Sequence, residues 1–230
     1  MDNENKKQIE TVVVKPSLSI FENETEHRLI SVQDETNLDN SIQKVEQFMA
    51  DNVGYGKPDS VKDQLYADAK ILWNEYAAHL RDTRFTFYLN RKQYQFLTEL
   101  LRDKLEYDVN TIFLAIELTN MLGTWHQEGT AKDDSTLKGY SSDATEITYM
   151  YHLISKHKVK GLSASTYLFA EVLRRIGEIS KVINYYDNAA KQLSQDIQKW
   201  VAAFEDDPNT TEGKTIAPKK GKKEKEEQVS

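Results

Sequence analysis

The sequence predicts a mainly α-helical protein, a bundle of about six helices organised on one long C-terminal helix. The main observation is that apolar residues between positions 164 and 205 recur at alternating steps of three and four, with no proline among them. Five earlier segments show the same helical period, and only residues 84–89 alternate as a strand does. The stripe on the long helix consists of Phe169, Val172, Ile176, Ile179, Ile183, Tyr186, Ala190, Leu193, Ile197, Trp200 and Phe204.

The long helix has a start signal and a stop signal. Ser163 can cap its first turn, and Pro208 follows soon after its last stripe residue. The positions beside the stripe are mostly apolar rather than charged, which favours a helix inside a bundle over a two-stranded coiled coil. At 1.5 Å per residue, residues 164–205 would extend over roughly 60 Å.

The C-terminal half of this helix is the first candidate binding surface. The longest of the other predicted helices, residues 61–81, is about half as long, so we expect part of the stripe to have no partner helix of matching length within the chain. Either the first two helices fold back onto this half, or self-association or another protein covers it. The candidate partner-binding residues here are Leu193, Ile197, Trp200, Val201 and Phe204.

The first 35 residues are expected to form a disordered arm. They carry eight acidic residues and no sustained helical period. Two β-branched runs, Val12, Val13 and Val14 after Thr11 and then residues 29–32, can add a strand to a sheet on a partner or on the protein's own body. A solvated tail that carries a few apolar residues is the alternative, and the arm's composition favours it.

Residues 36–207 are expected to form the helical domain. A first helix begins near Asn37, with Asn37 or Thr36 as its cap, and ends before Gly54 and Gly56. A second helix extends from residue 58 to 81. The strand at residues 84–89 needs a mate to satisfy its backbone, and the candidates are residues 11–14 and 158–160.

Three further helices follow the strand. Asn90 and Gln93 form a capping box at the start of one helix, which continues to about residue 105. The helix at residues 108–123 is apolar on all sides, which predicts a central position in the bundle. Asp143 and Glu146 signal the start of the helix that precedes the long one.

Residues 123–142 form a polar stretch that is too long for a passive connection, so it is either a functional loop or a disordered one. Trp125 could pin this stretch to the body, and if exposed it would be a contact residue for a partner. Residues 208–230 are rich in lysine and glutamate and are expected to be a disordered tail.

Composition excludes several classes of protein. The 230 residues contain no cysteine, which fits a reducing cytosol, and the first ten residues do not resemble a secretory signal. The longest apolar run, residues 112–116, cannot span a bilayer. A soluble protein is therefore expected, in the cytoplasm or in a particle assembled inside the cell. The net charge of −7 argues against bulk attraction to nucleic acid or anionic lipid.

No residue pattern specifies a reaction, so no catalytic, cofactor-binding or metal-binding residue and no small-molecule substrate is predicted. Glycine-rich phosphate loops and the paired Glu-x-x-His motifs of di-iron bundles are absent from the sequence. Glu75 and His79 form a single pair one helical turn apart, which is typical of a helix surface. His152 and His157 point to different faces, and Ser163 is needed as a helix cap.

Two features could serve nucleic acid, and both also have a simpler interpretation. Arg84, Arg91 and Lys92 alternate with aromatic residues, but those aromatics fit core positions of the strand and helix. The tail offers a basic cluster that three glutamates partly neutralise, so any contact with phosphate would be weak and sensitive to salt. That cluster is Lys219, Lys220, Lys222, Lys223 and Lys225.

We recognise no family from these residues, so the functional prediction depends on pattern alone. The favoured function is a non-enzymatic structural or interaction protein that works through helical surfaces and flexible arms, as a component of a larger assembly such as a virion. The alternative is an accessory protein that contacts nucleic acid through the basic tail. An enzyme with an unfamiliar site is the third possibility.

Overall fold

The computed structural model describes residues 15–20, 26–107, 109, 111–158, 161 and 163–204. This part of the chain is mainly α-helical, as predicted, with six α-helices and a two-stranded sheet. The helices are α1 Val32–Asp51, α2 Asp59–Asp82, α3 Arg91–Glu99, α4 Ile112–Gln127, α5 Ala144–Ser155 and α6 Ala164–Ala202. A π-helical turn, Leu100–Lys104, follows α3, and the strands are β1 Phe85–Leu89 and β2 Lys138–Ser142.

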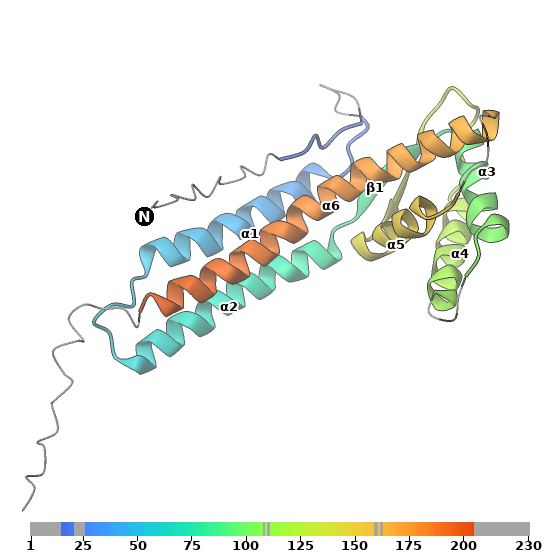
Figure 1. Ribbon diagram of the computed structural model, residues 1–230. Helices are drawn as coiled ribbons and strands as arrows, with labels where there is room; N and C mark the ends of the chain where they lie inside the picture. The colour runs from blue at the N-terminus through green and yellow to red at the C-terminus, as the bar shows by residue number, and fades with distance from the viewer. Residues whose placement is uncertain are drawn as a thin grey trace, which may run out of the picture.

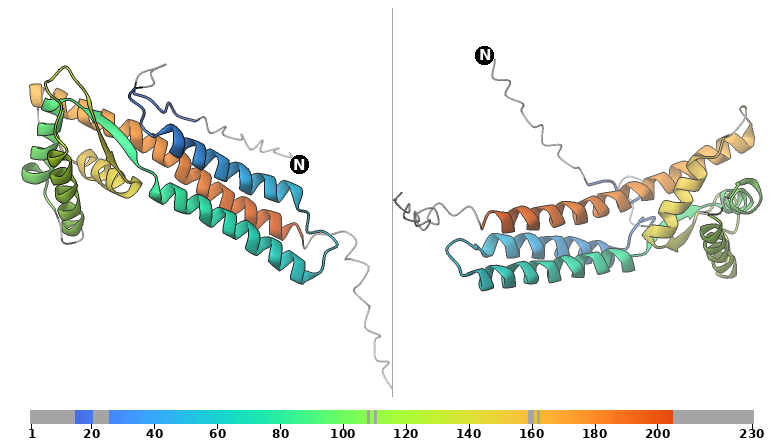
Figure 2. Two further views of the ribbon diagram at one scale, coloured as in Figure 1. Left: turned by 180° about the vertical axis from the view of Figure 1, so that it is seen from behind. Right: turned by 60° about the horizontal axis from the view of Figure 1, so that its bottom comes forward.

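The molecule is elongated, and α6 extends along its whole length (Figure 1). Its 39 residues correspond to roughly 60 Å at 1.5 Å per residue. Ser163 caps the helix as predicted, since its side chain accepts a hydrogen bond from the Thr166 amide. The first part of α6 packs against α3, α5 and β1, and the second part packs against α1 and α2 (Figure 2). The long helix therefore joins two groups of elements, and each group covers a different half of it.

The C-terminal half of α6 forms a three-helix bundle with α1 and α2. The Trp73 indole donates a hydrogen bond of 2.9 Å to the Ala190 carbonyl, and the Tyr76 hydroxyl donates one of 2.6 Å to the Tyr186 carbonyl. Residue numbers therefore increase along α2 as they decrease along α6, so these two helices are antiparallel. Burial raises the pKa of Tyr76, together with the charges near it.

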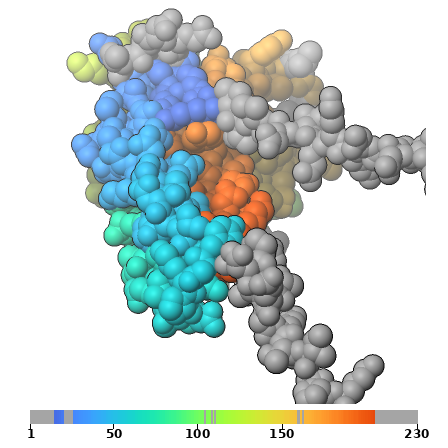
Figure 3. All heavy atoms as spheres, turned by 90° about the vertical axis from the view of Figure 1, so that its left-hand side faces the viewer, coloured from blue at the N-terminus to red at the C-terminus, as the bar shows by residue number. Residues whose placement is uncertain are grey.

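The turn between α1 and α2 closes the far end of this bundle. The Trp200 indole donates a hydrogen bond of 3.1 Å to the Asn52 carbonyl, and Phe204 packs against Gly54. In Figure 3, which views the molecule from this end, atoms of α6 lie beside those of α1 and of the turn that follows it. Of the two arrangements expected for this half, the first two helices fold back onto it.

The first helix starts earlier than expected. The helix begins at Val32 and is capped by Ser31, whose hydroxyl accepts a hydrogen bond from the Asp34 amide, so residue 36 lies inside α1. Leu29 and Ile30 are buried immediately before the cap. The Asn37 or Thr36 cap was a wrong prediction, because Ser31 and the acidic first turn stabilise an earlier start.

The mate of β1 is β2, and neither of the two candidates occupies that place. β1 pairs antiparallel with β2, in a register that sets Phe87 opposite Tyr140. On the other edge of β1, Ile30 forms an isolated bridge with Phe85, so the run at 29–32 contacts a sheet of the protein's own body without forming a strand of it. Residues 11–14 and 159–160 lie outside the described residues.

β2 occupies part of the stretch that was expected to be a loop. Only residues 128–137 connect α4 to the strand, because α4 continues through Gly123 to Gln127. A Cβ atom at Gly139 would lie 2.8 Å from Cγ2 of Thr86, so glycine permits the close approach of the two strands. Half of the stretch is therefore regular structure.

α4 lies at one edge of the molecule instead of at its centre (Figure 1). Only one face of this helix is buried, through Ala115, Leu118, Met121, Leu122 and Trp125. The expectation of a central helix was wrong, because apolar residues on all sides of α4 do not mean that all sides are covered. Its opposite face is exposed.

Candidate functional site

The first candidate surface, the C-terminal half of α6, is part of the core. Leu193, Ile197 and Phe204 are each less than 5% exposed, and Trp200 and Val201 are partly buried. Because α1 and α2 cover these side chains, they are not available to a partner while the bundle is intact. Their candidate role in partner binding is therefore replaced by a role in packing.

Trp125 fixes α4 to the strands and is not an exposed contact residue. It is 2% exposed, and its indole donates a hydrogen bond of 3.1 Å to the Ser141 carbonyl. Its ring lies edge-on to Phe87, with ring centroids 5.1 Å apart. Trp125 thus ties α4 to both strands, as the pinning interpretation predicted, and offers no surface to a partner.

The other candidates lie outside the described residues. These are Val12, Val13 and Val14 in the N-terminal arm and Lys219, Lys220, Lys222, Lys223 and Lys225 in the tail. The possible contacts of these residues with a partner or with nucleic acid stay predictions.

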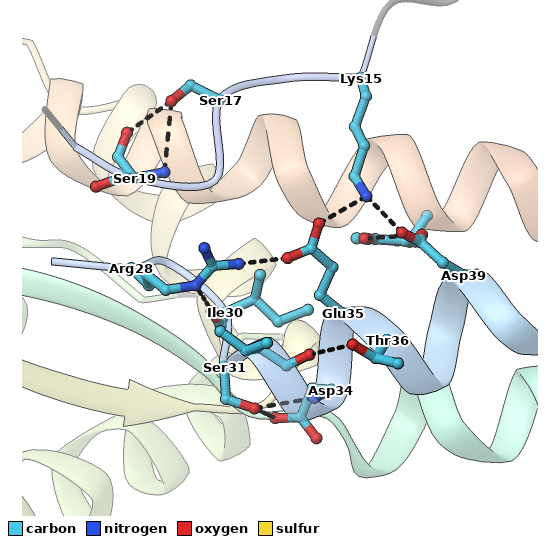
Figure 4. Close-up of polar contacts among 12 residues, drawn as sticks. Lys15, Ser17, Ser19, Arg28, Ile30, Ser31, Asp34, Glu35, Thr36 and Asp39 are labelled. Atoms are coloured by element: carbon cyan, nitrogen blue, oxygen red, sulfur yellow. Dashed lines mark hydrogen bonds and ion pairs between the residues drawn. The ribbon is translucent and has the colours of Figure 1, made fainter. Parts of the chain in front are cut away.

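A charged cluster holds the segment that follows Val14 against α1 (Figure 4). The ammonium group of Lys15 lies 2.9 Å from a carboxylate oxygen of Glu35 and 2.6 Å from one of Asp39. Arg28 forms an ion pair with the other oxygen of Glu35. The Tyr186 hydroxyl donates a hydrogen bond of 3.3 Å to Asp39, so the cluster also reaches α6.

The ionised forms of Lys15 and Glu35 are favoured in this cluster. Burial acts against the charge of Lys15, but its hydrogen bonds to Asp39 and Glu35 outweigh burial and raise the pKa of Lys15. Burial would also raise the pKa of Glu35, but the hydrogen bonds and charges of Lys15 and Arg28 lower it overall. Burial, followed by the charge of Asp39, raises the pKa of Tyr186 to about 12. The cluster therefore anchors the segment around Lys15 to α1 through ion pairs and hydrogen bonds.

The exposed face of α4 is the apolar surface that stands out on the described residues. Val109 is 84% exposed, Phe113 72%, Ile116 51% and Ile112 42%. Steps of three and four place these residues on one side of the helix and the turn before it, opposite the buried face. We call these four residues the α4 apolar face. Elsewhere the exposed aliphatic residues, such as Ile71 on α2, are dispersed along the helices.

Acidic side chains flank the α4 apolar face. Glu106 precedes it by three residues, and Glu117 lies one helical turn after Phe113. Both are exposed, and within the described part of the chain neither forms an ion pair. The face is thus an apolar strip bordered by carboxylates.

The sequence prediction included three of these four residues, but it placed them in the core. Ile112, Phe113 and Ile116 fitted a buried helix because their neighbours Leu114, Ala115 and Leu118 are also apolar. A useful signal was present in the second half of the helix, where Asn120, Gly123 and Gln127 continue the same outward stripe with polar or small residues. A helix that is buried on all sides would not carry them there.

Two kinds of site were sought in the described ranges and not found. No group of three or more His, Asp or Glu side chains there is placed to hold a metal ion. Among the same residues, no helix combines the length and the apolar character needed to cross a bilayer.

Comparison with known proteins gives no match to this chain, whether with models of protein families, with curated proteins or with solved structures.

Proposed function

We propose that this is a non-enzymatic interaction protein that binds a protein partner through the α4 apolar face, and that the partner's apolar side chains are flanked by basic ones. The exposure of four large apolar side chains on α4 and on the turn before it carries the proposal. Soluble proteins rarely leave such contiguous apolar surface bare unless it serves an interaction.

The composition of the face suits protein recognition. Phe113 projects from the helix with 72% of its surface exposed, and an aromatic side chain of this kind supplies much of the energy at protein interfaces. Trp125 and the neighbouring buried residues fix the opposite side of α4 to the strands, so the face is presented on a supported helix. A supported helix loses little conformational entropy on binding.

The carboxylates select the kind of partner. A basic side chain beside the partner's apolar contact would pair with Glu106 or Glu117, which form no ion pair within the described residues. A second copy packed antiparallel on the same face would place equal charges on the same flank of the helix pair, which is unfavourable. An anionic membrane surface would be repelled for the same reason.

Such a protein would act as a component of a larger assembly, with the elongated body holding the α4 face at one end (Figure 1). A role in a virion or another multiprotein complex belongs to this proposal. The alternative role with nucleic acid depends on lysines outside the described residues and stays a prediction.

Two synthetic peptides test the proposal. A helical peptide of leucine and lysine and one of leucine and glutamate, equal in length, are titrated into the full chain and followed by fluorescence anisotropy. The leucine–lysine peptide is expected to bind more tightly, because it matches both the apolar face and its carboxylates. The double variant Glu106→Gln and Glu117→Gln should weaken that binding, whereas the matched pair Glu46→Gln and Glu75→Gln on α1 and α2 should leave it unchanged.

Three results would contradict the proposal. Equal affinity for the two peptides would show that basic side chains on the partner do not contribute to binding. Equal affinity of Phe113→Ser and the parent for the leucine–lysine peptide would show that the α4 apolar face is not the binding surface. A parent chain that doubles its mass in light scattering, while Phe113→Ser stays monomeric, would assign the face to a second copy of the chain.

A further inference from the structure

A cleft of about 870 Å³ lies between α3 and α4 and is closed on a third side by the connection that follows α4. Its size falls within the range of ligand sites in proteins, roughly 300 to 1,000 Å³. It lies on the flank of α4 that carries Gly123 and His126, beside the α4 apolar face and separate from it. We propose that this cleft binds a phosphorylated small molecule of up to nucleotide size.

The first argument is charge. Arg91, Arg102 and Lys132 line the cleft together with His126, and among the described residues Glu99 is the one acidic residue in the lining. Arg102 forms an ion pair of 2.9 Å with Asp103, so the argument depends mainly on Arg91 and Lys132. This excess of cations stands in a chain whose net charge is −7. Cations gathered in a concave site attract anions more strongly than the same cations dispersed over a surface.

The second argument is that nearby acids are already engaged. The carboxylate of Asp133 accepts hydrogen bonds from the amides of Ser135 and Thr136, both at 2.9 Å. Asp134 forms an ion pair of 2.7 Å with Lys92. Within the described residues the side chains of Arg91 and Lys132 have no such partner, so their charges stay open to a ligand.

The third argument is the floor of the cleft, which is apolar and closed. Tyr94, Leu122 and Ala131 line it, and each is less than 9% exposed. The Tyr94 hydroxyl donates a hydrogen bond of 3.1 Å to the Leu122 carbonyl, and the Tyr94 ring stacks on Tyr140 at a centroid distance of 5.0 Å. The organic part of a ligand can therefore pack against this floor, while its phosphate group pairs with the cations at the rim of the cleft.

The set of donors favours phosphate over a single carboxylate. Guanidinium groups bind phosphate oxygens through paired hydrogen bonds, and a lysine adds a point charge. Gln95 also lines the cleft and offers an amide donor. Several cations match the two or more negative charges of a phosphate ester or diphosphate better than the one charge of a carboxylate.

Gly123 provides a way to block the cleft without removing a charge. It lines the cleft, and a Cβ atom built on it would meet no other atom within 4 Å. A larger side chain at this position would therefore project into open space. Because glycine is a poor helix former, replacing it inside α4 should not destabilise the helix.

The experiment is a titration of the full chain with ADP, followed by NMR chemical shifts and calorimetry, with pyrophosphate and adenosine as partial ligands. ADP should bind most tightly, and its affinity should fall as salt is added. The double variant Arg91→Gln and Lys132→Gln should weaken ADP binding by roughly tenfold or more, as the loss of charge-assisted hydrogen bonds predicts. Gly123→Leu should also block binding, whereas Gly123→Ala and the remote Lys57→Gln should bind like the parent.

Several outcomes would overturn this inference. The absence of a saturable ADP shift at millimolar concentration would be one such outcome, and ADP binding as tight as the parent's in both the charge variant and Gly123→Leu would be another. Adenosine that binds as tightly as ADP would exclude a phosphate site. A single-stranded oligonucleotide that binds, and is released by the same variants while ADP is not bound, would assign the cleft to nucleic acid instead. Because Arg91 and Lys132 do not belong to the α4 apolar face, the result with the charge variant is independent of the peptide experiment.

Discussion

The backbone of Gly54 lies against the face of the Phe204 ring, so closely that a Cβ atom at residue 54 would be 2.3 Å from Cγ of the ring. Phe204 is 3% exposed and comes just after the end of α6, whereas Gly54 belongs to the turn between α1 and α2. This contact closes the three-helix bundle at the end opposite the strands.

Gly54→Ala should therefore destabilise the protein. The added methyl group displaces the ring, and overpacking of this kind costs about 1–3 kcal/mol. Urea unfolding measures the cost in the parent and in the Phe204→Ala background. The cost of Gly54→Ala should be much smaller when the ring is absent, and an equal cost in both backgrounds would show that the two residues are not in contact.

Ile197→Asp tests whether the C-terminal half of α6 is core or interface. Ile197 is 1% exposed, so the variant buries a carboxylate without a partner. The free energy of unfolding should fall by roughly 3 kcal/mol or more. The melting temperature should fall at every protein concentration, because the contacts lie within one chain. A variant that keeps its stability but loses mass in light scattering would restore the interface interpretation.

The charged cluster predicts how stability depends on pH. The pKa of Glu35 is lower in the folded chain than its ordinary value of 4.5, so its contribution is present above that pH and is lost as the pH falls through the folded pKa. The pKa of Lys15 is raised above its ordinary 10.5, so its contribution is present below pH 10.5 and is lost at more alkaline pH.

Glu35→Gln measures that contribution. Because Lys15 and Glu35 are partly exposed, the loss at neutral pH should be modest, about 1 kcal/mol. The difference in unfolding free energy between parent and variant should shrink below pH 4.5, where the carboxylate of the parent becomes protonated. A difference that stays constant from pH 3 to pH 7 would mean that the ion pairs do not stabilise the fold.

The helices could be predicted because their signals are local. The unbroken stripe on α6, the capping box of Asn90 and Gln93, and the cap at Asp143 all specify helix and start point within a few residues. The structure confirms each of them. Such signals depend on hydrogen bonds and periodicity inside one segment, so they need no knowledge of the remaining chain.

The pairing of strands could not be predicted, because β2 has almost no strand character in its sequence. In the segment Lys138–Ser142 only Tyr140 is a large apolar residue, and Gly139 is a residue that strands usually avoid. The strand is determined by its neighbours, since Tyr140 packs on Phe87 and Tyr94. Tertiary contacts of this kind leave little trace in the local pattern.

The candidate site was missed for a related reason. Apolar residues on every side of α4 predict burial, yet whether Phe113 and Ile116 are covered depends on how many helices reach that side. The stripe on α6 gave the opposite error, since α1 and α2 cover the C-terminal half that was expected to lack a partner within the chain. Hydrophobicity predicts which side chains leave water, but the arrangement of the other helices decides which ones can do so within one chain.

The affinity for the leucine–lysine peptide tests the role of the α4 apolar face most directly when two isoleucines are compared. The two residues lie on different helices but have similar exposed fractions. Ile116 on the face is 51% exposed, and Ile71 on α2 is 55% exposed. Each is changed to serine, and the affinity of the full chain for the leucine–lysine peptide is measured by anisotropy. Both variants should fold as the parent does, since surface substitutions usually change stability by less than about 0.5 kcal/mol.

Ile116→Ser should weaken binding of the peptide by roughly tenfold, equivalent to about 1.4 kcal/mol, because an apolar contact at the face is lost. Ile71→Ser should bind the peptide like the parent. Equal affinities for Ile116→Ser, Ile71→Ser and the parent would contradict the assignment of the α4 apolar face as the surface through which this protein binds its partner.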